Sequence, residues 1–226
     1  MKNLIIAAHP DDEILGCGGT IARLVSEGNE VNVLILGEGI TSRTDIDAAE
    51  IKVQLEKLHA QSKRVAGVLG VNKLYMENLP DNRFDTVPLL NIIQKIEKVI
   101  NEVKPEIVYT QHGGDLNMDH VVTFRATMTA LRPMANCSVK ALYAYEVASS
   151  TEWAMQKFSP VFKPSRFVDI AEYFDKKLEA MKIYDGETRA FPHPRSEKAL
   201  YCQASKWGSS TGLEKAEAFE VIYEKI

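Results

Sequence analysis

The sequence is poor in cysteine. Its three cysteines, Cys17, Cys137 and Cys202, are odd in number, lie far apart and form no C-x-x-C pair. This arrangement argues against a disulfide framework and against a thiolate zinc site. We therefore expect a protein of a reducing compartment, the cytoplasm.

Long apolar runs and an excess of positive charge are also missing. No stretch approaches the roughly 18 apolar residues that span a bilayer, and the apolar run before His9 is too short for a signal-peptide core. The formal net charge of -4 offers no general attraction to nucleic acid or to an anionic membrane. We expect a soluble protein without membrane insertion and without a nucleic-acid partner.

The composition suits one globular domain. A chain of 226 residues with 45% apolar content can bury a substantial core, and it contains no internal repeat, low-complexity tract or linker. We expect a single domain over residues 1–226.

Strand-like runs alternate with helical spacing through residues 1–146. This alternation predicts an α/β fold, a mostly parallel sheet with helices on both faces. For residues 150–226 we expect an irregular C-terminal cap on the same core, with an edge strand at 165–170 and helices at 172–184 and 196–206. The strands expected before this cap are 4–8, 31–36, 73–76, 106–110 and 139–146, and the helices are 18–27, 45–69, 87–103 and 120–131.

The expected topology brings two polar segments together. If the strand order is 3-2-1-4-5, the first and fourth strands are neighbours whose connections leave in opposite directions, and ligands bind beyond their C-terminal ends. Residues 9–13 follow the first strand and residues 111–120 follow the fourth. Both segments should therefore line one crevice.

Four titratable side chains are crowded into the five residues from His9 to Glu13. At the exit of a buried strand they would cost stability through desolvation and mutual repulsion. A bound cation would turn the repulsion into coordination. A solvated acidic turn is the plainer alternative.

Counting ligands predicts a metal site. His9 and Asp12 lie three residues apart, and His120 opens the helix after the fourth strand. Two histidines and one carboxylate are a common catalytic zinc set that leaves one position for water. Asp11 is then available as the general base, and Asp119 could accept the outer N–H of a ligating imidazole. Alternatively, Asp119 and His120 only form the capped start of a helix, where an aspartate in the first turn interacts favourably with the helix dipole.

Several motifs resemble those of the LmbE/PIG-L family of zinc-dependent N-acetylglucosaminyl deacetylases. The specific ones are 8–13 (AHPDDE) and 113–120 (GGDLN-x-DH). Supporting ones are 79–82 (LPDN), 192–196 (PHPRS) and 216–219 (AEAF). Together they extend over nearly the whole chain.

The resemblance implies a Rossmann-like sheet and hydrolysis of an N-acetyl group from an amino sugar or an N-acetylglucosaminyl conjugate, with release of acetate and a free amine. It also implies that His9, Asp12 and His120 hold Zn²⁺ and that Asp11 is the base. These roles agree with those reached from spacing.

One position departs from the family pattern. Many members have a histidine where this chain has Asn117, and that histidine stabilises the oxyanion or protonates the leaving amine. Asparagine can donate a hydrogen bond to an oxyanion but cannot deliver a proton. The acid would then be protonated Asp11 or another histidine, with His193 preferred and His112 as the alternative. A surface turn is the plainer role for His193.

Three further residues are candidates for binding the substrate. Arg43, after the second strand, and Arg195 could bind sugar hydroxyls or a phosphate, and Asp81 follows the third strand at the same edge of the sheet. Charged loop residues are often merely solvated. Glu13 is expected to cap the following helix rather than to bind metal.

Other functions and properties stay open. A metallo-phosphoesterase could use a similar cluster but usually needs ligands for two metals, and a non-catalytic sugar-binding module would not need Asp11. His₂-carboxylate sites also accept iron or cobalt. The exact substrate and the oligomeric state, a homo-oligomer included, are not determined by the sequence.

Overall fold

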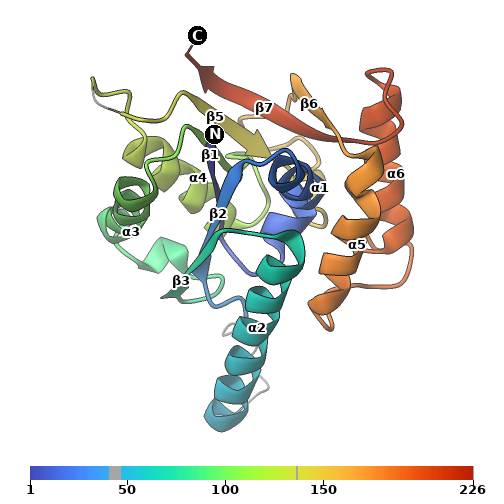
Figure 1. The fold of residues 1–226 in the computed structure, drawn as a ribbon. Helices are drawn as coiled ribbons and strands as arrows, with labels where there is room; N and C mark the ends of the chain where they lie inside the picture. The colour runs from blue at the N-terminus through green and yellow to red at the C-terminus, as the bar shows by residue number, and fades with distance from the viewer. Residues whose placement is uncertain (41–46, 136, 226) are drawn as a thin grey trace.

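A single mixed sheet forms the centre of the computed structural model, which describes residues 1–40, 47–135 and 137–225. The strand order is β3-β2-β1-β4-β5-β7-β6 (Figure 1). The first five strands are parallel and have the predicted order, whereas β7 and β6 are antiparallel additions at one edge. The strands are β1 (Lys2–Ala7), β2 (Glu30–Gly37), β3 (Lys73–Leu79), β4 (Ile107–Gln111), β5 (Ala141–Tyr145), β6 (Arg166–Asp169) and β7 (Ala216–Glu224).

Helices cover both faces of the sheet, as predicted. α3 packs against α4 on one face, whereas α1, α2 and α5 pack together on the other (Figure 1). None of the helices in the described residues is long and apolar enough to cross a membrane. The helices are α1 (Asp12–Ser26), α2 (Ala48–Leu69), α3 (Leu89–Val103), α4 (Met118–Ala130), α5 (Phe174–Ile183) and α6 (Glu197–Ser209), with 3₁₀ turns at η1 (Phe84–Thr86), η2 (Glu152–Ala154) and η3 (Ala171–Tyr173).

Two apolar cores result from the alternation of side chains along the strands. In β1, Leu4 and Ile6 join the core under α3 and α4, while Ile5 and Ala7 join the core under α1, α2 and α5. Successive strand residues point to opposite faces, so a strand covered on both faces is apolar throughout. This burial is why Leu4–Ala8 reads as a continuous apolar run.

Helix α1 begins earlier than the sequence predicts, at Asp12 instead of Gly18. The glycines at 16, 18 and 19 lower the helix propensity of this segment, so its sequence does not predict the first turns of the helix. A glycine is required at position 16 nonetheless, because the ring of Tyr145 fills the space that a side chain there would need. The early start places Asp12 in the first helical turn.

The C-terminal part is more regular than the expected cap. The edge strand β6 and the two predicted helices are present, but β7, the longest strand, was not expected. A buried ion pair attaches this part to α1: Glu217 of β7 accepts hydrogen bonds from the backbone N–H groups of Gly19 (3.0 Å) and Thr20 (2.7 Å). Lys177 of α5 donates to Glu217 at 2.6 Å.

Candidate active site

The loops that follow the parallel strands meet in a pocket of about 250 Å³, as the topology predicts. A larger groove of about 650 Å³ lies at the C-terminal ends of α3 and α4, but the candidate metal groups are not in it. The chemistry therefore belongs to the smaller pocket. Its lining residues are His9, Pro10, Asp11, Asp12, Gly39, Leu58, Asp81, Asn82, Asn117, His120, Ser149, Ser150, Glu187 and Arg195.

Three buried side chains converge as the sequence predicts for a metal. Asp12 Oδ2 lies 3.5 Å from His9 Nδ1 and 3.2 Å from His120 Nε2, and ligand atoms of all three lie within 4.8 Å of one another. Burial lowers the pKa of an imidazole, but hydrogen bonds to Asp119 and Asp12 raise the pKa of His9 to about 10. The charge of Asp12 likewise raises the pKa of His120 to about 9, against the effect of burial. The carboxylates around the two imidazoles thus favour their positively charged forms.

Asp12 is held in place by neighbours from two strands. Its Oδ2 accepts hydrogen bonds from the His9 backbone N–H (2.9 Å) and from Gln111 Nε2 (3.0 Å). Burial favours the neutral acid, but the two histidines outweigh it and hold the pKa of Asp12 well below its usual value. Asp12 is therefore a carboxylate at neutral pH, the form that binds a cation.

The other nitrogen of His9 faces two carboxylates. Asp119 Oδ2 lies 2.9 Å from His9 Nε2, and Asp81 Oδ1 lies 3.4 Å from it. Asp119 is fixed in turn, because its Oδ1 accepts from the Phe84 backbone N–H at 2.9 Å. Asp119 therefore occupies the place that a carboxylate behind a ligating histidine takes. His9, Asp81 and Asp119 are also close enough together to hold a cation, but this set shares His9 with the first.

His120 has an outer partner that the sequence reasoning did not assign. Asp115 Oδ1 lies 3.3 Å from His120 Nδ1, and Asp115 accepts hydrogen bonds from the hydroxyls of Ser150 and Thr151. The signal was available, since Asp115 belongs to the same motif as His120. Gln111 was missed as well, although it ends β4 where the topology places the crevice.

Asp11 has a strained backbone and a charged partner. Its φ of 101° lies in the left-handed region. This backbone conformation costs free energy for any residue with a side chain, and it is often found at functional sites. Its Oδ2 accepts a hydrogen bond from Arg195 Nη1 at 2.7 Å, and the same nitrogen lies 2.8 Å from Glu187 Oε2. Burial raises the pKa of Asp11 well above its usual value, and Arg195 acts in the opposite direction. No sequence signal marked Glu187, which lies in an irregular turn.

Asn117 lines the pocket and caps α4. Its Oδ1 accepts from the Asp119 backbone N–H at 2.8 Å, so Nδ2 is the atom that can donate, and it donates to Asn82 Oδ1 at 3.3 Å. The amide is therefore oriented with its donor side away from the helix.

The two candidate acid histidines are not brought to the pocket. His193 packs against Trp153, with ring centroids 5.5 Å apart, and its Nδ1 accepts from the Arg195 backbone N–H at 3.1 Å. His112 lies between Pro160 O (2.8 Å) and Glu220 Oε2 (3.0 Å). Neither ring lines the pocket. Of the three substrate candidates, Asp81 and Arg195 line it, and Arg43 lies outside the described residues.

The arrangement matches a known family. The PIG-L model, described as GlcNAc-PI de-N-acetylase, matches residues 4–131, more than half of the chain. The chain belongs to the PIG-L family. The family that the motifs predicted is thus confirmed, and the matched segment contains the three candidate ligands and Asp11.

Curated PIG-L relatives extend the likeness beyond that segment. YaiS of Escherichia coli K12, an uncharacterized deacetylase, is 31% identical over 187 residues, which are 79% of this chain and 88% of the relative. The diacetylchitobiose deacetylase of Thermococcus kodakarensis is 27% identical over 98% of this chain and 83% of its own.

Solved structures share the fold. The N,N'-diacetylchitobiose deacetylase of Pyrococcus horikoshii aligns with a TM-score of 0.79 at 22% identity, over 98% of this chain and 83% of its own. The 4-carboxy-2-hydroxymuconate hydratase GalB of Pseudomonas putida aligns with a TM-score of 0.77 at 18% identity, over 100% of this chain and 98% of its own. Since a hydratase shares the fold, the reaction must be argued from the site.

Proposed function

We propose that this PIG-L protein is a zinc-dependent deacetylase that removes the acetyl group from an N-acetylated amino sugar or a conjugate of one. The single observation that carries the proposal is the buried set His9–Asp12–His120 with Asp11 beside it. The curated relatives are deacetylases of N-acetylglucosamine compounds. We propose that residues 1–226 act as one catalytic domain, because the N-terminal and C-terminal parts share one sheet.

The donor set fits zinc. Two imidazole nitrogens and one carboxylate oxygen, all buried and within 4.8 Å of one another, are a known catalytic combination for this ion. When bound, the ion would lower the pKa of a water toward ~7 and polarise a carbonyl. A teicoplanin deacetylase with this fold is described in a zinc-inhibited form, so we keep the identity of the metal as part of the test.

Asp11 is the proposed general base. It is adjacent in sequence to Asp12 and lines the same pocket, where a carboxylate can take a proton from an attacking water. Burial raises its pKa well above the usual value, which makes it a stronger base than a solvated aspartate. The charge of Arg195 acts against this rise in the pKa, because it favours the ionised carboxylate.

Asn117 is the proposed donor to the oxyanion. Its Oδ1 is fixed by the cap of α4, which leaves Nδ2 as the donor in the pocket. A fixed donor aimed at developing negative charge stabilises a tetrahedral intermediate.

Asp11 is also the proposed acid. Neither His193 nor His112 lines the pocket, and His9 and His120 are assigned to the metal. A carboxyl with a raised pKa can carry the proton that it has taken and return it to the leaving amine. This double role would replace that of the histidine which the family pattern places at the position of Asn117.

The pocket suits a small polar group. Its volume of about 250 Å³ is below the ~300–1,000 Å³ typical of sites for drug-sized ligands, so it would hold one sugar ring with its acetamido group. The rest of a conjugate would lie outside. Arg195, Asp81 and Arg43 are proposed to bind sugar hydroxyls.

The test is a panel of N-acetylated sugars assayed for free amine. We expect amine and acetate in equal amounts, loss of activity after chelation, and recovery on addition of zinc. Asp11→Asn with its metal retained is the control for contaminating activity. Two tightly bound ions per chain together with phosphate release would instead support a phosphoesterase, and absence of turnover with sugar binding retained would support a binding module.

A further inference from the structure

Tyr184 and Glu13 form a buried pair next to the strained turn that carries Asp11. The Tyr184 hydroxyl donates to Glu13 Oε1 at 2.6 Å, and Glu13 Oε2 accepts from the Asp11 backbone N–H at 3.0 Å. Tyr184 is fully buried and Glu13 is 3% exposed. One carboxylate thus connects the end of α5 to the backbone of Asp11.

Neither group is needed to hold the metal. Glu13 is not in either candidate metal set, and neither Glu13 nor Tyr184 lines the pocket. Burial of a carboxylate is expensive unless hydrogen bonds compensate, and here both oxygens are used. The sequence predicts only that Glu13 caps α1; its second bond, to Tyr184, comes from a residue 171 positions away.

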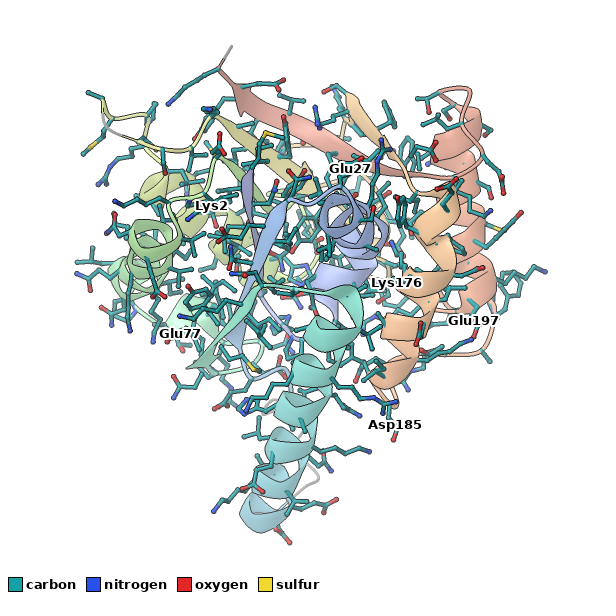
Figure 2. The ribbon with its side chains drawn as sticks, in the orientation of Figure 1. Lys2, Glu27, Glu77, Lys176, Asp185 and Glu197 are labelled. Carbon is teal, nitrogen blue, oxygen red and sulfur yellow. The ribbon has the colours of Figure 1, made fainter. Side chains whose placement is uncertain are left out.

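The same stretch of chain reaches Asp11 from the other side. Arg195 and Glu187 both follow Tyr184 in the chain. One guanidinium nitrogen of Arg195, Nη1, donates to Glu187 and also to the Asp11 carboxylate, the latter at 2.7 Å. The neighbouring Asp185 accepts from Lys57 of α2 at 2.8 Å, and Figure 2 shows Asp185 at the end of α5 beside α2. Residues 184–195 therefore hold both the backbone and the side chain of Asp11.

We propose that Glu13 and Tyr184 are positioning residues: they hold the Asp11 backbone at its positive φ, so that its carboxylate stays in line with the reacting water. The inference depends on the proposed role of Asp11 as base. Without the bond to Glu13, the Asp11 N–H loses its acceptor and the turn can relax toward ordinary φ values. The base would then move, whereas His9, Asp12 and His120 would keep their metal.

Three variants test the pair. Glu13→Ala removes both bonds, and a misplacement of about 1 Å costs on the order of 100-fold in kcat. Glu13→Gln can still accept from the Asp11 N–H through Oε1 and donate to the Tyr184 oxygen through Nε2, so we expect kcat within about threefold of wild type. Tyr184→Phe removes the bond to Glu13 but leaves the bond between Glu13 and the Asp11 N–H, and we expect about a tenfold lower kcat.

The matched control is Tyr143→Phe. Tyr143 is also buried and its hydroxyl also donates to a carboxylate, Glu224, at 3.0 Å, but it lies away from the pocket. We expect unchanged kcat. In all four variants KM and metal content should stay at wild-type values, and Glu13→Ala with Tyr184→Phe should cost no more than Glu13→Ala alone.

A crystal structure of Glu13→Ala gives a readout that does not need the substrate. We expect Asp11 to leave the positive-φ region while the three candidate ligands keep their positions. An unchanged Asp11 backbone, or an equal loss of kcat in Glu13→Gln and Glu13→Ala, would overturn the inference. If the wild-type protein released no amine from any substrate, the proposed function would fail and the structural readout would still decide the backbone role.

Discussion

The parallel strands β1 to β5 and the antiparallel edge β7–β6 contribute to the pocket in different ways. His9, Asp12 and His120 all follow parallel strands, and the family model ends at residue 131, shortly after the last of them. The C-terminal part supplies no candidate ligand among its described residues. It supplies the groups that contact Asp11.

In the proposed mechanism, the parallel strands therefore hold the metal, and the C-terminal part sets the position and the pKa of the base Asp11. Asp11 comes from the same turn as two of the proposed ligands, yet Arg195 binds its carboxylate and Tyr184, through Glu13, binds its backbone. Loss of a ligand should therefore remove both metal and activity. Changes in the C-terminal part should alter catalysis and leave the metal in place.

The largest expected effect is from His120→Ala. With one of three ligands gone, the protein should lose its metal, and activity should fall by about 10³-fold or more, since the ion supplies several kcal/mol of transition-state stabilisation. Metal analysis after dialysis, beside the amine assay, measures both. Full metal content in this variant would contradict the assigned ligand set.

Asp11→Asn should separate the two functions within one turn. We expect wild-type metal content and a kcat lower by about 10²- to 10⁴-fold, the usual contribution of a general base. Asparagine keeps the size of the side chain and a hydrogen-bonding oxygen for Arg195. Activity close to wild type would show that another group takes the proton.

Arg195→Gln tests the contribution of the C-terminal part to that base. Arg195 lowers the pKa of Asp11 and Glu187 raises it, so removing the cation should raise the Asp11 pKa further. The base works when deprotonated, so the acid limb of kcat/KM should move to higher pH. A shift of one pKa unit gives a loss of about tenfold below that limb.

Above the shifted limb, the kcat of Arg195→Gln should recover, whereas KM should stay above the wild-type value because a proposed contact to the sugar hydroxyls is lost. Arg195→Lys, which keeps the charge, is the matched control and should restore most of the original profile. A pH profile that coincides with wild type in Arg195→Gln would break the proposed link between the C-terminal part and the base.

The smallest expected effect is from His193→Ala. Its ring packs on Trp153 outside the pocket lining, and substitutions away from a site usually change free energies by less than about 0.5 kcal/mol. We therefore expect kcat within about twofold of wild type. A large loss with metal intact would restore His193 as the proton donor.

The sequence by itself indicated the parallel strands, the helices on both faces and the residues of the candidate metal set, whereas the strand order was a hypothesis that the structure confirms. These features follow from local periodicity and from the rule that ligands gather at the C-terminal ends of parallel strands, both of which can be read along the chain. His9, Asp12 and His120 were therefore predictable. The concentration of four titratable side chains within residues 9–13 could likewise be read from the sequence.

Only the tertiary structure decided how Asp11 is held. The ring of Tyr145 occupies the space beside Gly16 in the early part of α1, and the strand β7 pairs with β5. Tyr184 reaches Glu13 and Arg195 reaches Asp11 from more than 170 residues away, and Glu187 binds Arg195. No local pattern encodes such contacts, because they join residues that are far apart in the sequence.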